Sequence, residues 1–201
     1  MSKLKLSNFY YGAVLNAILE KNPEFSPTLV LYDDDNRQAY KILTEYNEKY
    51  ILFLKYATSR NCKKNGYNSW TFNFSQNDKK QLQEYSIDSS VFICLLCLKE
   101  ELQNSQLAIL TYNEYLKINN KNSITINLEK RKKNFGLFLG YSKARKDTYP
   151  IPRNRIEKSF KDILNENNTK KNNIDISTQI QALIRTELLK FLRKNDGNHL
   201  I

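Results

Sequence analysis

Apolar residues in several parts of the chain recur with the period of an α-helix. One helix is predicted after Ser7, which is placed to cap it, and before Asn22-Pro23, which is expected to end it. Its inward face is formed by apolar residues three or four positions apart, namely Tyr11, Val14, Leu15 and Ile18. Two later helices are expected, one over residues 75–84 with Ser75 as its cap and a shorter one over residues 112–116.

Other segments show the two-residue alternation, or the continuous apolar run, of β-strands. Trp70, Phe72 and Phe74 alternate with polar residues, so their aromatic face is expected in the core. Residues 50–75 are expected to form one long hairpin, and the mixed residues 36–47 to include a helical turn. The strands predicted in this way cover residues 28–32, 50–57, 70–75, 91–98, 107–110, 123–128 and 135–141.

Together these segments predict an α+β fold with a mixed central sheet, flanking helices and a tethered C-terminal amphipathic helix. The 201 residues are enough for one core domain, which we place at residues 1–160. Residues 161–175, rich in Asn and Lys, are expected to be a flexible linker, and residues 176–201 a helix. That helix is expected to pack on the core, on a partner protein or on a second copy of the chain.

The sequence also indicates where the protein works and what its cysteines do. No apolar run approaches the roughly 18 residues of a spanning helix, and the first residues lack the apolar centre of a signal peptide. We therefore expect a cytoplasmic protein without a membrane partner. Cys94 and Cys97 lie in the apolar run 91–98, which favours buried core thiols over a metal or redox pair.

Positive charge is concentrated in the second half of the chain. The net charge is +11, and residues 101–201 carry 19 Lys+Arg against 10 Asp+Glu, whereas residues 1–100 carry 13 against 11. Such an excess suits a polyanion, so we expect nucleic acid as the partner, DNA rather than RNA, unless the excess reflects a proteome rich in Lys and Asn. The expected contacts are Lys130, Arg131, Lys132 and Lys133, at the tip of a hairpin, with Lys143, Arg145, Lys146, Arg153 and Arg155.

Few kinds of catalytic chemistry are open to this composition. The single histidine, His199, lies two residues from the C-terminal end of the sequence, where we do not expect it to support a histidine triad or a zinc site. The five glycines form neither a dinucleotide-binding nor a P-loop motif. An enzyme built from these residues would depend on carboxylates, lysine and a metal ion, and nothing indicates an organic cofactor.

Three acids follow the strand at 28–32, and Lys55 lies in the apolar strand at 50–57. With the order helix, three strands, helix, strand, this resembles the restriction-endonuclease-like, or PD-(D/E)xK, nuclease superfamily over roughly residues 7–98. The resemblance implies that Asp35 and Lys55 are catalytic and that Asp34 and Asp35 hold Mg²⁺. The pattern departs at Phe53, where the second acid is expected, and its substitute would be one of Glu20, Glu48 and Glu84.

Each of these features also has a structural explanation. Lys55 would then lie on an edge strand or extend its amino group to water, and the three acids would solvate a turn. The sequence thus leaves open a nuclease, or nuclease subunit, of a restriction or phage-defence type and a non-catalytic basic module that binds nucleic acid or assembles with other proteins. A purely protein-binding role, with the C-terminal helix as the docking element, is a third possibility.

Overall fold

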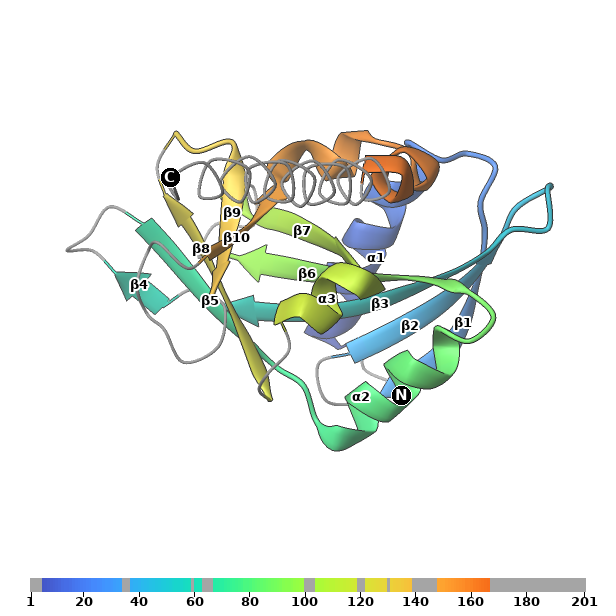
Figure 1. Cartoon of the computed structure of the whole chain (residues 1–201), viewed down its shortest axis with the longest axis horizontal. Helices are drawn as coiled ribbons and strands as arrows, with labels where there is room; N and C mark the ends of the chain where they lie inside the picture. The colour runs from blue at the N-terminus through green and yellow to red at the C-terminus, as the bar shows by residue number, and fades with distance from the viewer. Residues whose placement is uncertain are drawn as a thin grey trace, which may run out of the picture. The chain divides into compact units, whose positions relative to one another are not determined.

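The computed structural model describes residues 5–33, 37–58, 60–62, 67–99, 104–118, 122–129, 131–138 and 148–166. The chain divides into two compact units, Met1–Ser159 and Phe160–Ile201. Both helices and strands are present in the first unit, which confirms the α+β class, but its strands form two sheets rather than one central sheet (Figure 1).

The first of these, sheet A, is a mixed sheet. Its strands lie in the order β1 (Ser26–Asp33), β2 (Arg37–Leu43), β3 (Lys49–Thr58), β6 (Ser90–Leu98) and β7 (Gln106–Thr111). The pair β3–β6 is parallel, and the other neighbouring pairs are antiparallel. Because β6 is buried from Val91 onward and β3 from Tyr50 to Lys55, their near-continuous apolar sequences suit the central positions of this sheet.

Sheet B consists of antiparallel pairs. Its strands lie in the order β10 (Thr148–Pro152), β9 (Asn134–Phe138), β8 (Ser123–Glu129), β5 (Tyr67–Asn73) and β4 (Arg60–Cys62). Residues along β8 alternate between buried and half-exposed, which is typical of a sheet with one face in the core. We call the other face, which carries Thr71, Asn73 and Asn127, the outer face of sheet B.

The described part of the first unit also contains the helices α1 (Leu6–Leu19), α2 (Gln76–Tyr85) and α3 (Tyr112–Ile118) and the 3₁₀ helix η2 (Arg153–Glu157). Tyr11, Val14 and Ile18 are buried on α1 as predicted, but the helix begins after Lys5, so Ser7 lies inside it and does not cap it. Within the described residues, none of the helices combines the length and apolar character needed to cross a bilayer.

The main core lies between the two sheets. The aromatic face predicted for residues 70–74 is confirmed, because Trp70, Phe72 and Phe74 are each about 1% exposed. The ring of Phe74, just after β5, stacks on that of Phe53 on β3 with their centroids 6.5 Å apart, and the Trp70 indole N–H donates to the Leu98 carbonyl at 2.7 Å. These aromatic side chains bury a large apolar area between the sheets.

The cysteines of β6 are part of this core, as predicted. Cys94 and Cys97 are both free thiols and fully buried. Burial raises the pKa of the Cys94 thiol to about 12 and that of Cys97 well above its ordinary value. A thiol that stays protonated is a poor nucleophile and a poor metal ligand, so both residues serve packing.

Two predictions about the strands are wrong. Of residues 36–47, those that the structure describes form β2 and a hydrogen-bonded turn, in which the Asn47 amide donates to the Thr44 carbonyl, and no helix. Residues 50–75 do not form one hairpin, because β3 pairs with β2 and β6 in sheet A while β5 pairs with β4 and β8 in sheet B. The physical reason is burial: β3 is apolar on both faces and needs neighbours on both, whereas β5 alternates and leaves one face exposed.

The second unit is described only in part. Residues 160–166 are helical, and Phe160 and Ile163 are buried. The predicted flexible linker at 161–175 therefore begins inside a helix, which corrects that boundary. The predicted C-terminal helix at 176–201 lies outside the described residues.

Candidate nucleic-acid interface

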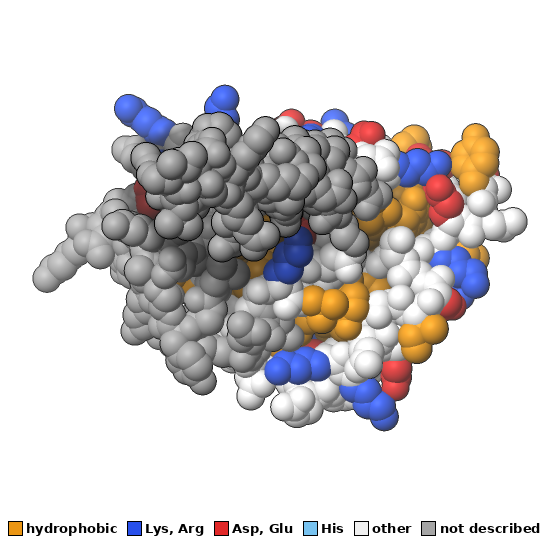
Figure 2. Space-filling view, in the orientation of Figure 1, with side chains coloured by type: hydrophobic (Ala, Val, Ile, Leu, Met, Phe, Trp, Pro, Cys, Tyr) orange, Lys and Arg blue, Asp and Glu red, His pale blue; other side chains and the backbone are white. Residues whose placement is uncertain are grey.

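The turn between β8 and β9 forms the basic hairpin tip that the sequence predicts. The Lys132 amide donates to the Glu129 carbonyl at 3.2 Å, and Arg131 adopts a left-handed backbone with φ of 68°. Three consecutive cations, Arg131, Lys132 and Lys133, are exposed there, and we call them the basic tip. Blue side chains project from the molecule at the end where β8 and β9 join (Figure 2). Lys130 lies outside the described residues.

Arg153 holds the basic tip in place. Its backbone amide donates to the Lys133 carbonyl at 3.1 Å, and its Nη1 donates to the Lys132 carbonyl at 3.0 Å. Its Nη2 donates to Oε1 of Gln106 at 2.7 Å, which ties the hairpin to the start of β7. The half-buried Arg153 side chain, expected to contact nucleic acid directly, thus positions the residues beside it.

A hollow of about 220 Å³ opens beside the basic tip, on the outer face of sheet B. Strands β8, β9 and β10 form it, and Lys132 of the basic tip is one of its walls. Its other lining residues are acidic Glu129, polar Asn127, Asn134 and Thr148, apolar Phe135, Phe138 and Pro150, and Gly136. The tip and the hollow together make a cationic surface next to a polar one.

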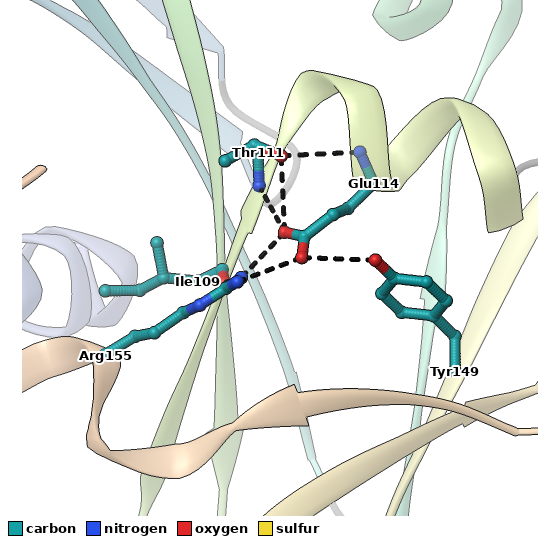
Figure 3. Close-up of polar contacts among 5 residues, drawn as sticks. All are labelled: Ile109, Thr111, Glu114, Tyr149 and Arg155. Carbon is teal, nitrogen blue, oxygen red and sulfur yellow. Dashed lines mark hydrogen bonds and ion pairs between the residues drawn. The ribbon is translucent and has the colours of Figure 1, made fainter. Parts of the chain in front are cut away.

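Arg155, another expected nucleic-acid contact, is instead fully buried, so this prediction is wrong. Its guanidinium donates to both carboxylate oxygens of Glu114, at 2.6 and 2.9 Å, and to the Ile109 carbonyl at 2.9 Å (Figure 3). A guanidinium enclosed in this way has no access to a phosphate. Lys143, Arg145 and Lys146 belong to residues 139–147, outside the described part of the chain.

The carboxylate that binds Arg155 is positioned by the start of α3. Thr111 and Glu114 form a capping box: the Glu114 side chain accepts from the Thr111 amide at 3.0 Å, and the Glu114 amide donates to Thr111 Oγ1 at 3.4 Å. The Tyr149 hydroxyl also donates to Glu114, at 3.4 Å (Figure 3). Burial alone would raise the pKa of Glu114, but Arg155 and Thr111 hold it below its ordinary value.

Lys55, the expected catalytic lysine, lies in a second buried cluster. Its Nζ contacts Oδ2 of Asp78 at 3.0 Å and lies over the Phe74 ring, 5.4 Å from its centroid. Arg37, opposite Lys55 on β2, pairs with the other oxygen of Asp78. Lys55 is therefore neither on an edge strand nor extended into water, and both structural explanations of it are wrong.

Asp78 is the acid that sequence reasoning missed. It forms a capping box with Ser75 at the start of α2, and its Oδ2 accepts from the Ser75 amide at 2.7 Å. Burial would raise the pKa of Asp78, but Lys55 and Arg37 lower it below the ordinary value. The spacing Ser75-x-x-Asp78 is visible in the sequence and was the available signal.

None of the acids expected beside Lys55 is seen to contact it in the described residues. Asp34 and Asp35 lie outside the described residues, although Asp33, Arg37 and Lys55 occupy neighbouring positions across β1, β2 and β3. Glu20 accepts from Asn16 at 2.8 Å, Glu48 from the Tyr50 hydroxyl at 2.9 Å, and Glu84 pairs with Lys80 at 3.8 Å. In the described ranges, no three acids, histidines or cysteines come together as a metal site would require.

Comparison with known proteins returns no matching family model, no matching curated protein and no matching solved structure.

Proposed function

We propose that this protein binds nucleic acid through the basic tip and the outer face of sheet B. The observation that carries the proposal is the basic tip itself: three consecutive exposed cations on a turn whose backbone is held by two hydrogen bonds from Arg153. A preorganised cationic turn loses little entropy when it meets a phosphate backbone.

Charge distribution supports the choice of this turn over the rest of the surface. On the face shown in Figure 2, cationic and acidic side chains are interspersed around α2 and the neighbouring edge of sheet A. At the basic tip, by contrast, like charges are adjacent in sequence and all exposed. Adjacent cations neutralise adjacent phosphates and release their counterions, which is the main source of affinity for a nucleic-acid backbone.

We expect the triple variant Arg131→Asn, Lys132→Gln and Lys133→Gln to bind a DNA oligonucleotide about tenfold to a hundredfold more weakly at low salt. The slope of log affinity against log salt should fall by about 2–3, because each phosphate contact contributes about 0.7–0.9. Asn is chosen at position 131 because it tolerates the left-handed backbone there. Fluorescence anisotropy over a salt series measures both quantities.

The matched control removes the same charge elsewhere. Lys21, Lys80 and Lys117 are exposed, and replacing all three with Gln changes the net charge equally. The control should keep most of the affinity and the salt slope. Equal losses in both triple variants would mean that net charge, and not the basic tip, attracts the DNA.

A metal-dependent nuclease is a second candidate, favoured by one observation. Asp33, the first of the three acids, lies in register with Arg37, which lies in register with Lys55. Strand β1 therefore ends in the row of the buried lysine, and Asp34 and Asp35 follow it directly in the sequence, which suits the resemblance to PD-(D/E)xK nucleases. Asp34 and Asp35 would hold Mg²⁺, whose charge would stabilise the phosphate undergoing hydrolysis.

If this candidate is right, the protein cuts plasmid DNA with Mg²⁺ or Mn²⁺ but not with EDTA, and Asp35→Asn lowers the rate at least a hundredfold. Asp88→Asn, which removes an exposed acid paired with Lys49 at the start of β3, should leave cleavage unchanged. Absence of cleavage by the wild-type protein, with DNA binding intact, would leave the non-catalytic function alone.

A further inference from the structure

We propose that the hollow beside the basic tip receives an unstacked base, so that the protein prefers single-stranded nucleic acid to a duplex. This inference rests on the nucleic-acid binding proposed above and adds which form of nucleic acid is bound and where one of its bases lies. It follows from the register of three strands, the chemistry of the walls and the size of the hollow.

The hollow exists because a glycine lies between two residues with side chains. Asn127 on β8 is opposite Gly136 on β9, and Gly136 is opposite Pro150 on β10. These three positions form one row across sheet B, and neighbouring positions in a row face the same side of a sheet. Since Gly136 has no side chain, the space above the backbone between Asn127 and Pro150 is not filled, and the sheet itself is the floor of the hollow.

The walls suit the ring and the edge of a base. Phe138, two residues after Gly136 on the same strand, is half-exposed, and Pro150 is exposed, so both offer apolar surface for stacking. Asn127 and Asn134 line the hollow with amides, which carry both donors and acceptors. Lys132 links the hollow to the phosphates that the basic tip would bind.

Asn127 provides an independent indication of a missing partner. Its Oδ1 is buried and accepts no hydrogen bond from the described residues. Unsatisfied buried acceptors are uncommon in folded proteins because the lost hydration is not recovered. A ring N–H or exocyclic amine entering the hollow, with a small rotation of the amide, would supply the donor.

The size of the hollow limits what it can hold. Its volume of about 220 Å³ is below the roughly 300–1,000 Å³ of pockets that enclose drug-sized ligands, so a single ring system fits better than a cofactor. A base inside a duplex is stacked on both faces and paired along its edge. Only an unstacked base can present a free face and a free edge here, which favours single strands.

The test compares three labelled 12-mers by fluorescence anisotropy: a single strand of mixed sequence, its duplex, and a strand of the same length whose nucleotides are abasic. The wild-type protein is expected to bind the single strand about tenfold more tightly than the abasic strand, because one stacked and hydrogen-bonded base is worth about that factor. It should also bind the single strand more tightly than the duplex.

Gly136→Val fills the hollow and should remove this preference while leaving affinity for the abasic strand unchanged. A Cβ at position 136 would lie 3.4 Å from Thr148 Cβ and Oγ1, which is a tight but tolerable contact, and Val suits a strand. Phe138→Ser, which removes a wall instead of filling the floor, is the second variant should Gly136→Val unfold. Thr28→Val, at an exposed position on β1 of sheet A and outside the proposed binding surface, is the matched control.

Each outcome decides something. Equal affinity of the wild-type protein for the single strand and the abasic strand, or an unaltered preference in folded Gly136→Val or Phe138→Ser, would overturn the base site and leave the basic tip as a backbone contact. Failure of the wild-type protein to bind any of the three 12-mers would overturn both this inference and the proposed function.

Discussion

Replacing Arg155 with methionine is expected to lower the free energy of unfolding by about 3–5 kcal/mol, because a buried carboxylate would lose its partner. Arg155 is 0% exposed and Glu114 is 1% exposed, so water cannot replace the lost guanidinium. The Thr111 and Tyr149 hydrogen bonds remain, but both donors are neutral and hold the charge less strongly. Urea unfolding at pH 7, followed by the fluorescence of Trp70, measures the change.

Two further variants separate the ion pair from general effects of the substitution. Arg131→Met removes an exposed arginine and should change stability by less than about 0.5 kcal/mol. The double variant Glu114→Gln with Arg155→Met should recover part of the loss, because no unpaired charge is then left in the core. A cost below about 1 kcal/mol for Arg155→Met alone would show that Glu114 reaches water or is protonated in the folded protein.

Most strands could be predicted because their burial matches a simple period. The apolar run 91–98 became β6, the alternating residues 70–74 lie in and just after β5, and the basic residues near 130 lie at a hairpin tip. β2 was missed because it starts with Arg37 and Gln38, polar residues that are buried there. A polar residue enters the core only with a partner, and the partner of Arg37 is Asp78, 41 residues away.

Of the residues expected to bind nucleic acid, the sequence correctly placed those of the exposed hairpin tip but not those of the stretch around Arg153. The hairpin and its cations follow from local sequence. Whether a given cation is exposed or buried, however, depends on which acid the fold brings next to it. Arg153 and Arg155 are two residues apart in one basic stretch, yet one supports the basic tip and the other binds Glu114 in the core. Charge density alone cannot distinguish them.

The two buried clusters share a design that sequence spacing partly reveals. In each, an acid at the third helical position closes a capping box and also binds a cation from a distant segment: Asp78 binds Lys55, and Glu114 binds Arg155. The capping box fixes the carboxylate, so the ion pair forms with less loss of side-chain entropy. The capping boxes can be recognised from the sequence, but the distant cation that each acid binds cannot.

The second large effect is expected at Asp78. Asp78→Asn keeps an oxygen that can accept from the Ser75 amide, so the capping box is largely preserved. It removes the negative charge that Lys55 and Arg37 share, and both cations are only about 8% exposed. We expect the free energy of unfolding to fall by about 3–5 kcal/mol at pH 7, measured by urea unfolding.

The effect of Asp78→Asn should depend on pH with a definite sign. Because the cluster lowers the folded-state pKa of Asp78, its stabilisation is complete above the ordinary value near 4 and is lost as pH falls through the lower folded value. The gap between wild type and Asp78→Asn should therefore be widest at pH 7 and narrow below about pH 4. Asp88→Asn, at an exposed position paired loosely with Lys49 at 3.8 Å, should show almost no gap at either pH. A gap for Asp78→Asn that stays constant from pH 7 to pH 3 would mean that the amide disturbs packing and that the charge of Asp78 contributes little.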